Sequence, residues 1–544
     1  MRKGTKVGIT RKRAYILLAL IVLFGTILSS FLFKGMSFYG DDFAYVGFLP
    51  QIFSSTFKSY LNIFSLRLML LFPIAFFVKM FGYTDLGAGA YALVCYVVSI
   101  VLVFLLGKEF KGYNVGLLSA LLFAIYPATL HYNTEPNPML PLVMLLTLAV
   151  LLFVYGKKFN NKWLYALSGI STFMGALVNP LAYLYILFFG TYIVVDFIYG
   201  FASRNRPHYQ YLMYFIGVAT AIVILGFVNL HITQNANPFY EFQLTNSYYS
   251  AAGGPDQIYY TNPSLSFYIG GYFPYSFNSL GSLFDQVFNF QYLNLNDVGF
   301  FSYFVVLAGA YLLAIKSRRR YLFLLGWAAF LVVYMEFGTM SITHYFPIYK
   351  LTRFTMVVAA PLMLVLGAGL IELKERLFKR KELYGMIVIG AVVVFLFATS
   401  ITMDYYYYIL NYNTTMFSKL IAQALLSAPN LSNSTVYGSA LTPWYFIYYM
   451  GFPAMRGFGQ YGSGQDGTTV MPTCASIPNN TYLLIPDAQA LTYINSLNLW
   501  NINESWAFNP SECNLTLYAN IYNNSLVNGK YYYLAYTGNL YYKS

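Results

Sequence analysis

The stretch "RKRAYILLALIVLFGTILSSFLFKGMSFYGDDFAYV", residues 11–46, combines the features that decide the class of fold. Basic residues come first, about 20 apolar residues follow as far as Phe33, and two adjacent acids come after them, Asp41 and Asp42. An apolar run of about 20 residues can cross a bilayer as a helix, and basic residues beside it favour the cytoplasmic side. We therefore expect a first membrane span with the N-terminus in the cytoplasm. The run is longer than the core of a cleavable signal and lacks a small-residue cleavage motif, so we expect the span to be retained.

The composition of the whole chain supports the same class. The chain has 544 residues, of which 58% are hydrophobic and 9% are charged, whereas soluble domains contain roughly a quarter charged residues. Its net charge of +13 comes from short basic clusters between apolar runs, which is the pattern of cytoplasmic loops rather than of a nucleic-acid-binding surface. The sequence therefore predicts a polytopic α-helical membrane protein.

The apolar runs predict eleven membrane-spanning helices. They lie near residues 14–33, 87–107, 115–130, 138–156, 163–178, 181–201, 209–230, 299–315, 321–337, 353–372 and 384–403. An odd number of spans places the C-terminus outside. Most of the 32 Lys and Arg residues then fall in cytoplasmic segments and most of the 19 Asp and Glu residues fall outside, as the positive-inside rule requires.

This topology leaves three long external segments. Residues 34–86 are apolar but interrupted by charges and a proline, which favours helices lying along the membrane surface. Residues 231–298 form a second external loop rich in Tyr, Asn and Gly. The tail, 404–544, alternates apolar and polar residues, which predicts an α/β or β-rich fold. We therefore divide the chain into a transmembrane domain, 1–403, and an external C-terminal domain, 404–544.

All acceptor sequences for N-glycosylation lie in the tail, which supports its external location because glycans mark exported surfaces. They occur at Asn413, Asn430, Asn433, Asn479, Asn503, Asn514 and Asn523. Cys474 and Cys513 lie there too, and they form either a disulfide, which an oxidising exterior permits, or two free thiols. Cys95 falls inside a predicted span, where we expect it to contribute to packing.

Asp41 and Asp42 are the first candidate catalytic residues. Partial burial under apolar side chains would raise the pKa of a carboxyl group toward working pH and make it a useful general base. Because adjacent residues on a helix point in different directions, we expect one acid to act and the other to support it. The alternative is that both are solvated and cap the helix that follows.

The loop "HYNTEPNPMLPL", residues 131–142, joins two predicted spans on the outside. It contains His131 and Glu135, and it is either part of the site or a rigid proline-rich turn before a helix. The hairpin at Asn179–Pro180 is external as well, and there we expect only a turn between spans.

The segment "EFGTMSITHYFPIYKLTRF", residues 336–354, also joins two spans on the outside. Its Lys350 and Arg353 are three residues apart, so they share a face if the segment is helical. The planar guanidinium group suits phosphate. The alternative is that both side chains reach toward the lipid headgroups.

Several motifs that would indicate other functions are missing from the sequence. It contains no Walker A sequence, no dinucleotide GxGxxG before a helix, no HExxH and no paired CxxC, which argues against nucleotide hydrolysis and the common zinc sites. The Gly-rich stretch "GSGQDG", residues 462–467, lacks the lysine of a phosphate loop, and there we expect a surface turn. Most spans also lack the ionisable residues that transporters and proton pumps need. The ionisable residues gather instead at the external rim, which suits a substrate that is part lipid and part sugar or phosphate.

The order of these elements resembles the GT-C membrane glycosyltransferases, in particular the branch of the protein O-mannosyltransferases and the lipid A aminoarabinose transferases. Those enzymes place a D-E-x-x-Y-A motif after the first span, and "DDFAYV", residues 41–46, is similar, with Tyr45 at or beside the aromatic position. A later external Arg followed by an aromatic residue precedes a proline-containing span, and "TRFTMVVAAPLMLVLGAGL", residues 352–370, is similar. The resemblance covers roughly residues 14–375.

The resemblance implies that a hexose is transferred from a polyprenyl-phosphate donor, of the dolichyl-phosphate type, to an acceptor hydroxyl on the external face of the cell membrane. Asp41 would take the acceptor proton, and one-step displacement would invert the anomeric carbon. Arg353, Lys350 and Arg67 would hold the leaving phosphate. The leaving group is already charged, so no metal is required, although a divalent metal remains compatible with this chemistry.

Further contacts and partners follow from the same resemblance. Tyr45, His131 and His344 are candidate substrate-binding residues, and Glu135 is a candidate third catalytic acid. The acceptor would be a glycan, a protein or a lipid, with membrane lipids around it and no nucleic acid involved.

The sequence also departs from the family at three points. Asn137 stands before a proline where relatives often have an acid, and Asn179 stands where they often have a basic residue. The W-W-D-x-G motif of oligosaccharyltransferases is absent, so we set that activity aside. The alternative function is non-enzymatic, either a flippase for lipid-linked sugars or a scaffold for surface assembly.

Overall fold

The computed structural model describes residues 9–36, 42–57, 64–202, 209–233, 237, 243, 300–339, 348, 352–378, 381–439, 446–451, 457–461, 479–486, 516–521 and 538–543. The chain divides into two compact units. The first comprises residues 1–33, 51–77 and 89–406, and the second comprises residues 34–50, 78–88 and 407–544. The predicted domain boundary after residue 403 stays a prediction.

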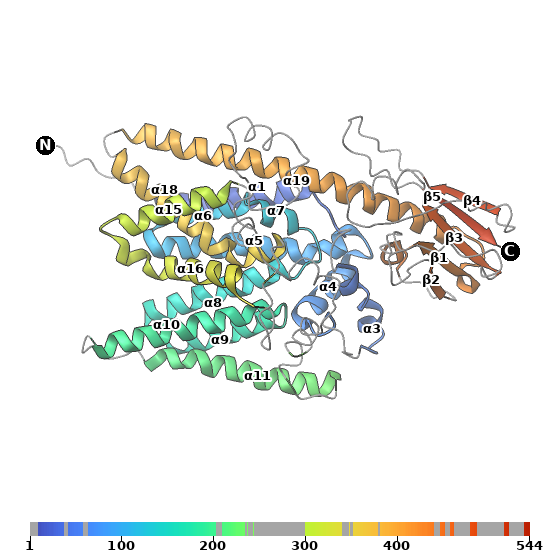
Figure 1. Cartoon of the computed structure of the whole chain (residues 1–544), viewed down its shortest axis with the longest axis horizontal. Helices are drawn as coiled ribbons and strands as arrows, with labels where there is room; N and C mark the ends of the chain where they lie inside the picture. The colour runs from blue at the N-terminus through green and yellow to red at the C-terminus, as the bar shows by residue number, and fades with distance from the viewer. Residues whose placement is uncertain are drawn as a thin grey trace. The chain divides into compact units, whose positions relative to one another are not determined.

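The first unit is built from helices (Figure 1). Those lying wholly or largely within it are α1 (Arg11–Phe31), α5 (Asp85–Lys111), α6 (Tyr113–Ala124), α7 (Pro127–Tyr132), α8 (Met139–Phe159), α9 (Lys162–Ala176), α10 (Tyr183–Ala202), α11 (Leu212–Thr233), α15 (Phe301–Ala314), α16 (Leu322–Phe337), α17 (Thr352–Thr355), α18 (Ala359–Leu377) and α19 (Glu382–Leu426). Each of the eleven predicted spans overlaps at least one of these helices.

Eight helical stretches among the described residues are long and apolar enough to cross a membrane. The prediction of a polytopic helical membrane protein is therefore confirmed. The helices α6 and α15, at two of the other predicted spans, are apolar but shorter. The count of eleven spans and the external position of the C-terminus stay predictions.

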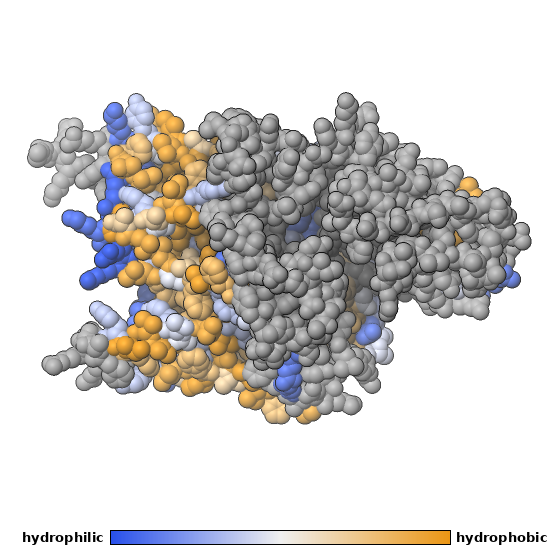
Figure 2. Space-filling view, in the orientation of Figure 1, coloured by the Kyte–Doolittle hydropathy of each residue, from blue (hydrophilic) through white to orange (hydrophobic). Residues whose placement is uncertain are grey.

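The surface of this unit carries the apolar side chains that a bilayer requires. Ile198, Phe227 and Leu307 are each more than 60% exposed, and apolar residues gather over the helices in Figure 2. Such a surface would be unfavourable in water, where an apolar patch of this extent marks an interaction site. In a membrane these side chains contact lipid, so their exposure is expected.

Ion pairs and a hydrogen bond connect several of the turns predicted to be cytoplasmic. Glu372, near the end of α18, lies 3.0 Å from Lys111 at the end of α5, and Arg376 donates to the hydroxyl of Ser317 after α15 at 3.2 Å. Lys158 at the end of α8 pairs with Glu109 of α5. These basic residues therefore share one end of the bundle, as the positive-inside pattern requires.

Two helices of the first unit pack at very short range. A Cβ on Gly217 of α11 would collide with the carbonyl oxygen of Ala166 in α9, and a Cβ on Gly169 of α9 would collide with the carbonyl oxygen of Tyr214 in α11. Small residues allow backbones to approach in this way inside membranes.

Replacing Gly217 by alanine should therefore destabilise the protein by about 1–3 kcal/mol, because the extra methyl group forces α9 and α11 apart. Gly390→Ala is the matched control, since a Cβ there meets nothing within 4 Å and alanine favours a helix over glycine. Thermal unfolding of the purified variants in one detergent measures the difference. Equal melting temperatures for the two variants would contradict the close approach.

The second unit contains a mixed five-stranded sheet. Its strands are β1 (Thr435–Ser439), β2 (Gly457–Tyr461), β3 (Thr481–Pro486), β4 (Thr516–Ile521) and β5 (Gly538–Lys543), in the order β2-β1-β3-β5-β4. The strand β1 is parallel to β2 and β3, whereas β5 is antiparallel to β3 and β4. A β-bulge interrupts the pairing of β4 with β5.

The last turns of α19 form the core of this unit together with the sheet. Ile421 and Leu425 of the helix pack in one buried cluster with Val436, Tyr482 and Leu540 of the strands. A helix packed on a mixed sheet is an α/β arrangement, so the first of the two predicted folds for the tail is confirmed. The last predicted span ends at residue 403, whereas the helix α19 continues to Leu426 because its apolar positions keep the helical spacing.

Short helices occupy the predicted external loop 34–86. They are α2 (Asp42–Val46), α3 (Leu49–Phe53) and α4 (Leu68–Phe81), which contains Pro73. The expectation of helices in this loop is confirmed, and their position along a membrane surface stays a prediction. A further short helix, α20 (Phe446–Tyr449), lies in the tail.

The acceptor asparagines can be placed only in part. Asn430, Asn433 and Asn479 are exposed, as glycosylation requires, and Asn413 lies within α19. Asn503, Asn514, Asn523, Cys474 and Cys513 lie outside the described residues. Cys95 is buried and carries a free thiol, as expected for a packing residue.

Candidate functional site

A buried polar loop of the first unit joins α7 to α8. Its Glu135 and Asn137 are only 1% and 2% exposed. Burial of a carboxyl group inside a protein is costly unless it is paired. The burial of Glu135 therefore makes it a candidate site residue.

Local capping explains why the chain turns here. Pro127 occupies the first turn of α7 and breaks the preceding helix, while the Thr129 hydroxyl donates to the carbonyl of Tyr126 at 2.8 Å. At the other end, the side-chain oxygen of Asn137 accepts from the N–H of Met139 at 3.0 Å and caps α8. The predicted proline-rich turn is therefore present, and the role of Glu135 as a site residue stays a prediction.

Two contacts hold the middle of the loop. The Asn133 amide donates to the Ser29 hydroxyl of α1 at 2.7 Å, and Asn133 itself is 1% exposed. A Cβ on Gly89 of α5 would collide with the carbonyl oxygen of Thr134, so α5 lies directly against the loop. Glu135 is therefore presented by a fixed backbone rather than by a loose one.

The segment that carries Arg67 contacts the same stretch of α5. Its side chain is 8% exposed, and two residues later the Met69 carbonyl accepts from the Tyr91 hydroxyl of α5 at 2.9 Å. Tyr91 and Gly89 are neighbours on α5, so the segments that carry Arg67 and Glu135 both contact one turn of that helix. The guanidinium of Arg67 also lies 5.4 Å from the ring centre of Phe64.

Arg353 comes from the opposite end of the sequence and reaches the same region. It lies in α17, which contacts α7, and its guanidinium lies 5.3 Å from the ring centre of Phe354. The backbone that follows is fixed by Tyr185, whose hydroxyl donates to the Val357 carbonyl at 3.2 Å. Arg353 is half-buried, so its planar fork of donors can reach a ligand.

His131 completes the group, because it lies in the last turn of α7 and is 8% exposed. Its ring meets the ring of Tyr132 edge to face at 4.2 Å. Neighbouring elements therefore carry a buried carboxyl group, an imidazole and two guanidinium groups. In a low-dielectric setting such cations interact strongly with an anion, and a carboxylate can accept a proton.

The structure describes only some of the predicted site residues. It places His131, Glu135 and Arg353 on or beside the contacting helices α7 and α17 of the first unit, and it places the segment of Arg67 against α5. Asp42 is the first residue of α2 and Tyr45 is fully buried in the same helix, in the second unit. Asp41, His344 and Lys350 lie outside the described residues.

Two features of this region were missed by the sequence analysis. One is the bond from Asn133 to Ser29, which joins residues 104 positions apart and leaves no local signal. The other is Asn179, whose side chain accepts from the Leu181 N–H at 3.0 Å and caps a short 3-10 helix. The pattern Asn-Pro at a helix start could have indicated that cap. In the described part of the chain, no three His, Cys, Asp or Glu side chains are placed to hold one metal ion.

Comparison with solved structures identifies the fold. Over 98% of both chains, the structure matches ArnT from Cupriavidus metallidurans bound to undecaprenyl phosphate, with a TM-score of 0.54 and 12% identity. It also matches the oligosaccharyltransferase of Archaeoglobus fulgidus over 88% of this chain and 69% of that one, with a TM-score of 0.55 and 12% identity. The protein has the GT-C glycosyltransferase fold.

The sequence comparisons agree with the fold. Residues 68–226 match the profile of the dolichyl-phosphate-mannose-protein mannosyltransferase family, and this range includes the turn of α5 and the loop that carries Glu135. A comparison with curated protein sequences gives no match. The family match and the GT-C fold together indicate a glycosyltransferase and confirm the resemblance seen in the sequence.

Proposed function

We propose that this GT-C protein transfers a hexose from a polyprenyl-phosphate donor to an acceptor hydroxyl at the external face of the membrane. The observation that carries the proposal is the buried loop of Glu135, which follows α7, the helix that contacts the Arg353 helix α17. A carboxyl group together with guanidinium groups suits a reaction in which an anionic phosphate leaves. The family match and the fold support the same class of reaction.

In the proposed step, the acceptor oxygen forms a bond to the anomeric carbon as the bond from that carbon to the phosphate oxygen breaks. The acceptor proton passes to a carboxylate, for which we propose Asp41, supported by Asp42. The electron pair of the broken bond leaves with the polyprenyl phosphate. Attack from the face opposite to the phosphate inverts the anomeric carbon.

The basic residues act on the leaving group in this proposal. Arg353 and Arg67, with Lys350, would donate to the phosphate oxygens and stabilise the charge that grows there. Charge-assisted bonds of this kind each contribute about 1.5–3 kcal/mol. Tyr45, His131 and His344 are proposed to contact the sugar or the acceptor. The lipid tail would stay in the bilayer, which explains a phosphate site made by residues at the membrane surface.

A reconstituted assay tests this function. Purified protein in lipid is supplied with a polyprenyl-phosphate hexose and a hydroxyl acceptor, and free polyprenyl phosphate is measured together with sugar on the acceptor. The proposal predicts one polyprenyl phosphate released for each sugar transferred. A flippase or a scaffold would release none, and that outcome across several donor sugars would overturn the proposal.

Glu135→Gln provides a separate prediction. The amide keeps the size of the side chain but cannot carry the carboxylate charge, so turnover should fall about 10²-fold if the carboxylate acts in proton transfer. Glu375→Gln is the control, because that carboxylate is exposed at the opposite end of the helices and pairs with Lys111. A Glu135→Gln variant with normal turnover would show that the loop has only a structural role.

A further inference from the structure

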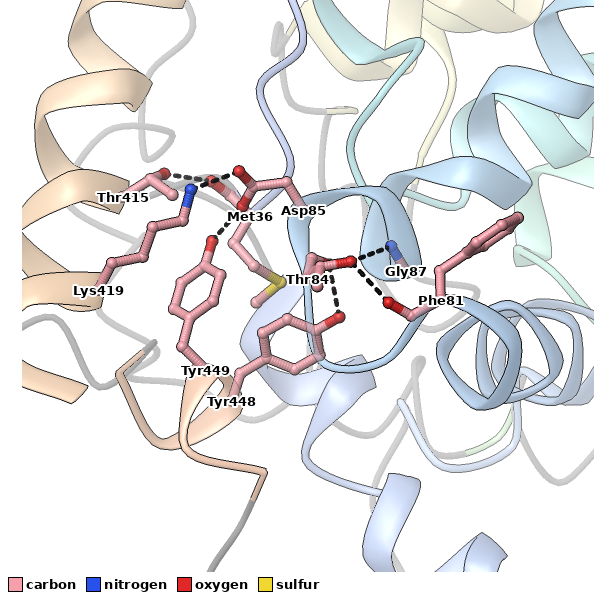
Figure 3. A network of polar contacts seen from close by, with 9 residues as sticks. All are labelled: Met36, Phe81, Thr84, Asp85, Gly87, Thr415, Lys419, Tyr448 and Tyr449. Atoms are coloured by element: carbon pink, nitrogen blue, oxygen red, sulfur yellow. Dashed lines mark hydrogen bonds and ion pairs between the residues drawn. The ribbon is translucent and has the colours of Figure 1, made fainter. Parts of the chain in front are cut away.

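A polar network in the second unit surrounds the first residue of α5 (Figure 3). Asp85, the first residue of α5, accepts from the Lys419 ammonium of α19 and from the Tyr449 hydroxyl of α20, the latter at 2.6 Å. Tyr448 donates to the Thr84 carbonyl at 2.9 Å, and the Thr84 hydroxyl caps α5 by accepting from Gly87. The network joins segments more than 300 residues apart.

The same network holds the chain that leads to Asp41 and Asp42. Gly35 has a φ of +70° and lies against Asp85, so that a Cβ there would be 2.7 Å from the carboxylate oxygen. One residue later, the Met36 carbonyl accepts from the Thr415 hydroxyl of α19 at 3.2 Å. Met36 is 1% exposed, so the chain is fixed at this point.

The chain is fixed again just after the two acids. The helix α2 begins at Asp42, and its Tyr45 and Val46 are fully buried. Only residues 37–41 join the fixed Met36 to this helix. Asp41 therefore follows Met36 by five residues along the chain and directly precedes α2.

We propose that Asp85, Lys419 and Tyr449 are positioning residues, which place the segment of Asp41 and Asp42 for the transfer reaction. The inference rests on the proposed function for its effect on turnover. The Asp85 and Lys419 side chains are about a third exposed, and ion pairs of that exposure add little stability. Their main effect is therefore on the position of Gly35 and Met36, not on the stability of the fold.

The chemistry of the network suits this role over a wide pH range. Burial, with the Asp85 carboxylate as the next cause, raises the pKa of Tyr449 well above its ordinary value. Tyr449 thus keeps its proton and remains a donor to Asp85. The ammonium of Lys419 also lies 5.3 Å from the centre of the Tyr449 ring, so the three side chains form one connected group.

Gly35→Ala tests the placement, with Gly82→Ala as its matched control. Both glycines have φ near +70°, but a Cβ on Gly82 meets nothing within 4 Å, whereas one on Gly35 meets Asp85. Both variants pay the left-handed backbone cost of about 1–2 kcal/mol, and only Gly35→Ala displaces the network. We expect kcat to fall about 10²-fold in Gly35→Ala, since a misplacement of 1 Å can cost that much. Gly82→Ala should stay within about threefold of the original protein.

Lys419→Met and Lys419→Arg give a second test that does not depend on the strained backbone. The Lys419→Met variant should have a kcat that is lower by about tenfold or more, with unchanged KM for the donor and unchanged melting temperature. The Lys419→Arg variant should keep most of the original kcat. Equal kcat in Lys419→Met and the original protein would overturn the proposal. A loss of kcat that follows the loss of melting temperature would overturn it too.

Hydrogen exchange separates this inference from the proposed function. Amide exchange of the peptide 37–46 should be faster in Lys419→Met than in the original protein, whether or not either one transfers sugar. If the original protein releases no polyprenyl phosphate, the proposed function fails while the exchange result still decides the placement. Identical exchange in both proteins would refute the positioning role.

Discussion

Asp41→Asn is expected to reduce sugar transfer about 10²–10⁴-fold, the largest effect of any single substitution in this protein. The amide cannot take the acceptor proton, and a positioned general base contributes a factor of this order. The measurement is kcat for release of polyprenyl phosphate by reconstituted protein, with the melting temperature as evidence of folding.

Asp42→Asn distinguishes the proposed base from its neighbour. Asp42 begins α2, and a negative charge at a helix N-terminus contributes about 0.3–1 kcal/mol. We therefore expect a reduction in kcat of less than tenfold. A larger loss in Asp42→Asn than in Asp41→Asn would assign the base to Asp42, and normal kcat in both would contradict an acid at this motif.

Arg353→Met should lower kcat/KM for the lipid donor about 10²–10³-fold. Removal of one donor to the developing charge costs about that much in enzymes that stabilise an anion in the transition state. The kcat/KM of Arg353→Lys should lie between those of Arg353→Met and the original protein. Lysine keeps the positive charge but lacks the planar guanidinium group that pairs with phosphate.

Arg319→Met is the matched control for this substitution. Arg319 is exposed in the turn between α15 and α16, at the end of the bundle that is predicted to be cytoplasmic. Its loss should leave kcat/KM within about twofold. If Arg353→Met behaves like Arg319→Met, the guanidinium of Arg353 serves the lipid interface and not the phosphate.

The sequence was sufficient to predict the helical bundle because membrane spans are local. A run such as residues 14–33 carries its own signal, and α1 (Arg11–Phe31) lies where that run predicted it. The predicted span 115–130 was less accurate, because Pro127 splits it into α6 and α7. The extension of α19 to Leu426 was missed because the aromatic run after residue 403 lacks the strong apolar character of a span.

The candidate site was harder to predict because its contacts join distant residues. Sequence patterns identified Glu135, His131 and Arg353 as candidates, and the structure places them on adjoining elements. The arrangement of α5 against the loop depends on Gly89 and the carbonyl of Thr134, a contact that no local pattern reveals. Lys419 escaped notice for the same reason, since its partner Asp85 is 334 residues away.

The central claim is that basic residues at this site hold the phosphate of a polyprenyl carrier. The most direct test is an experimental structure of the Glu135→Gln variant in lipid with polyprenyl phosphate bound. The account predicts phosphate oxygens within about 3 Å of the Arg353 guanidinium nitrogens. A phosphate bound elsewhere on the protein, with Arg353 directed at lipid headgroups, would contradict it.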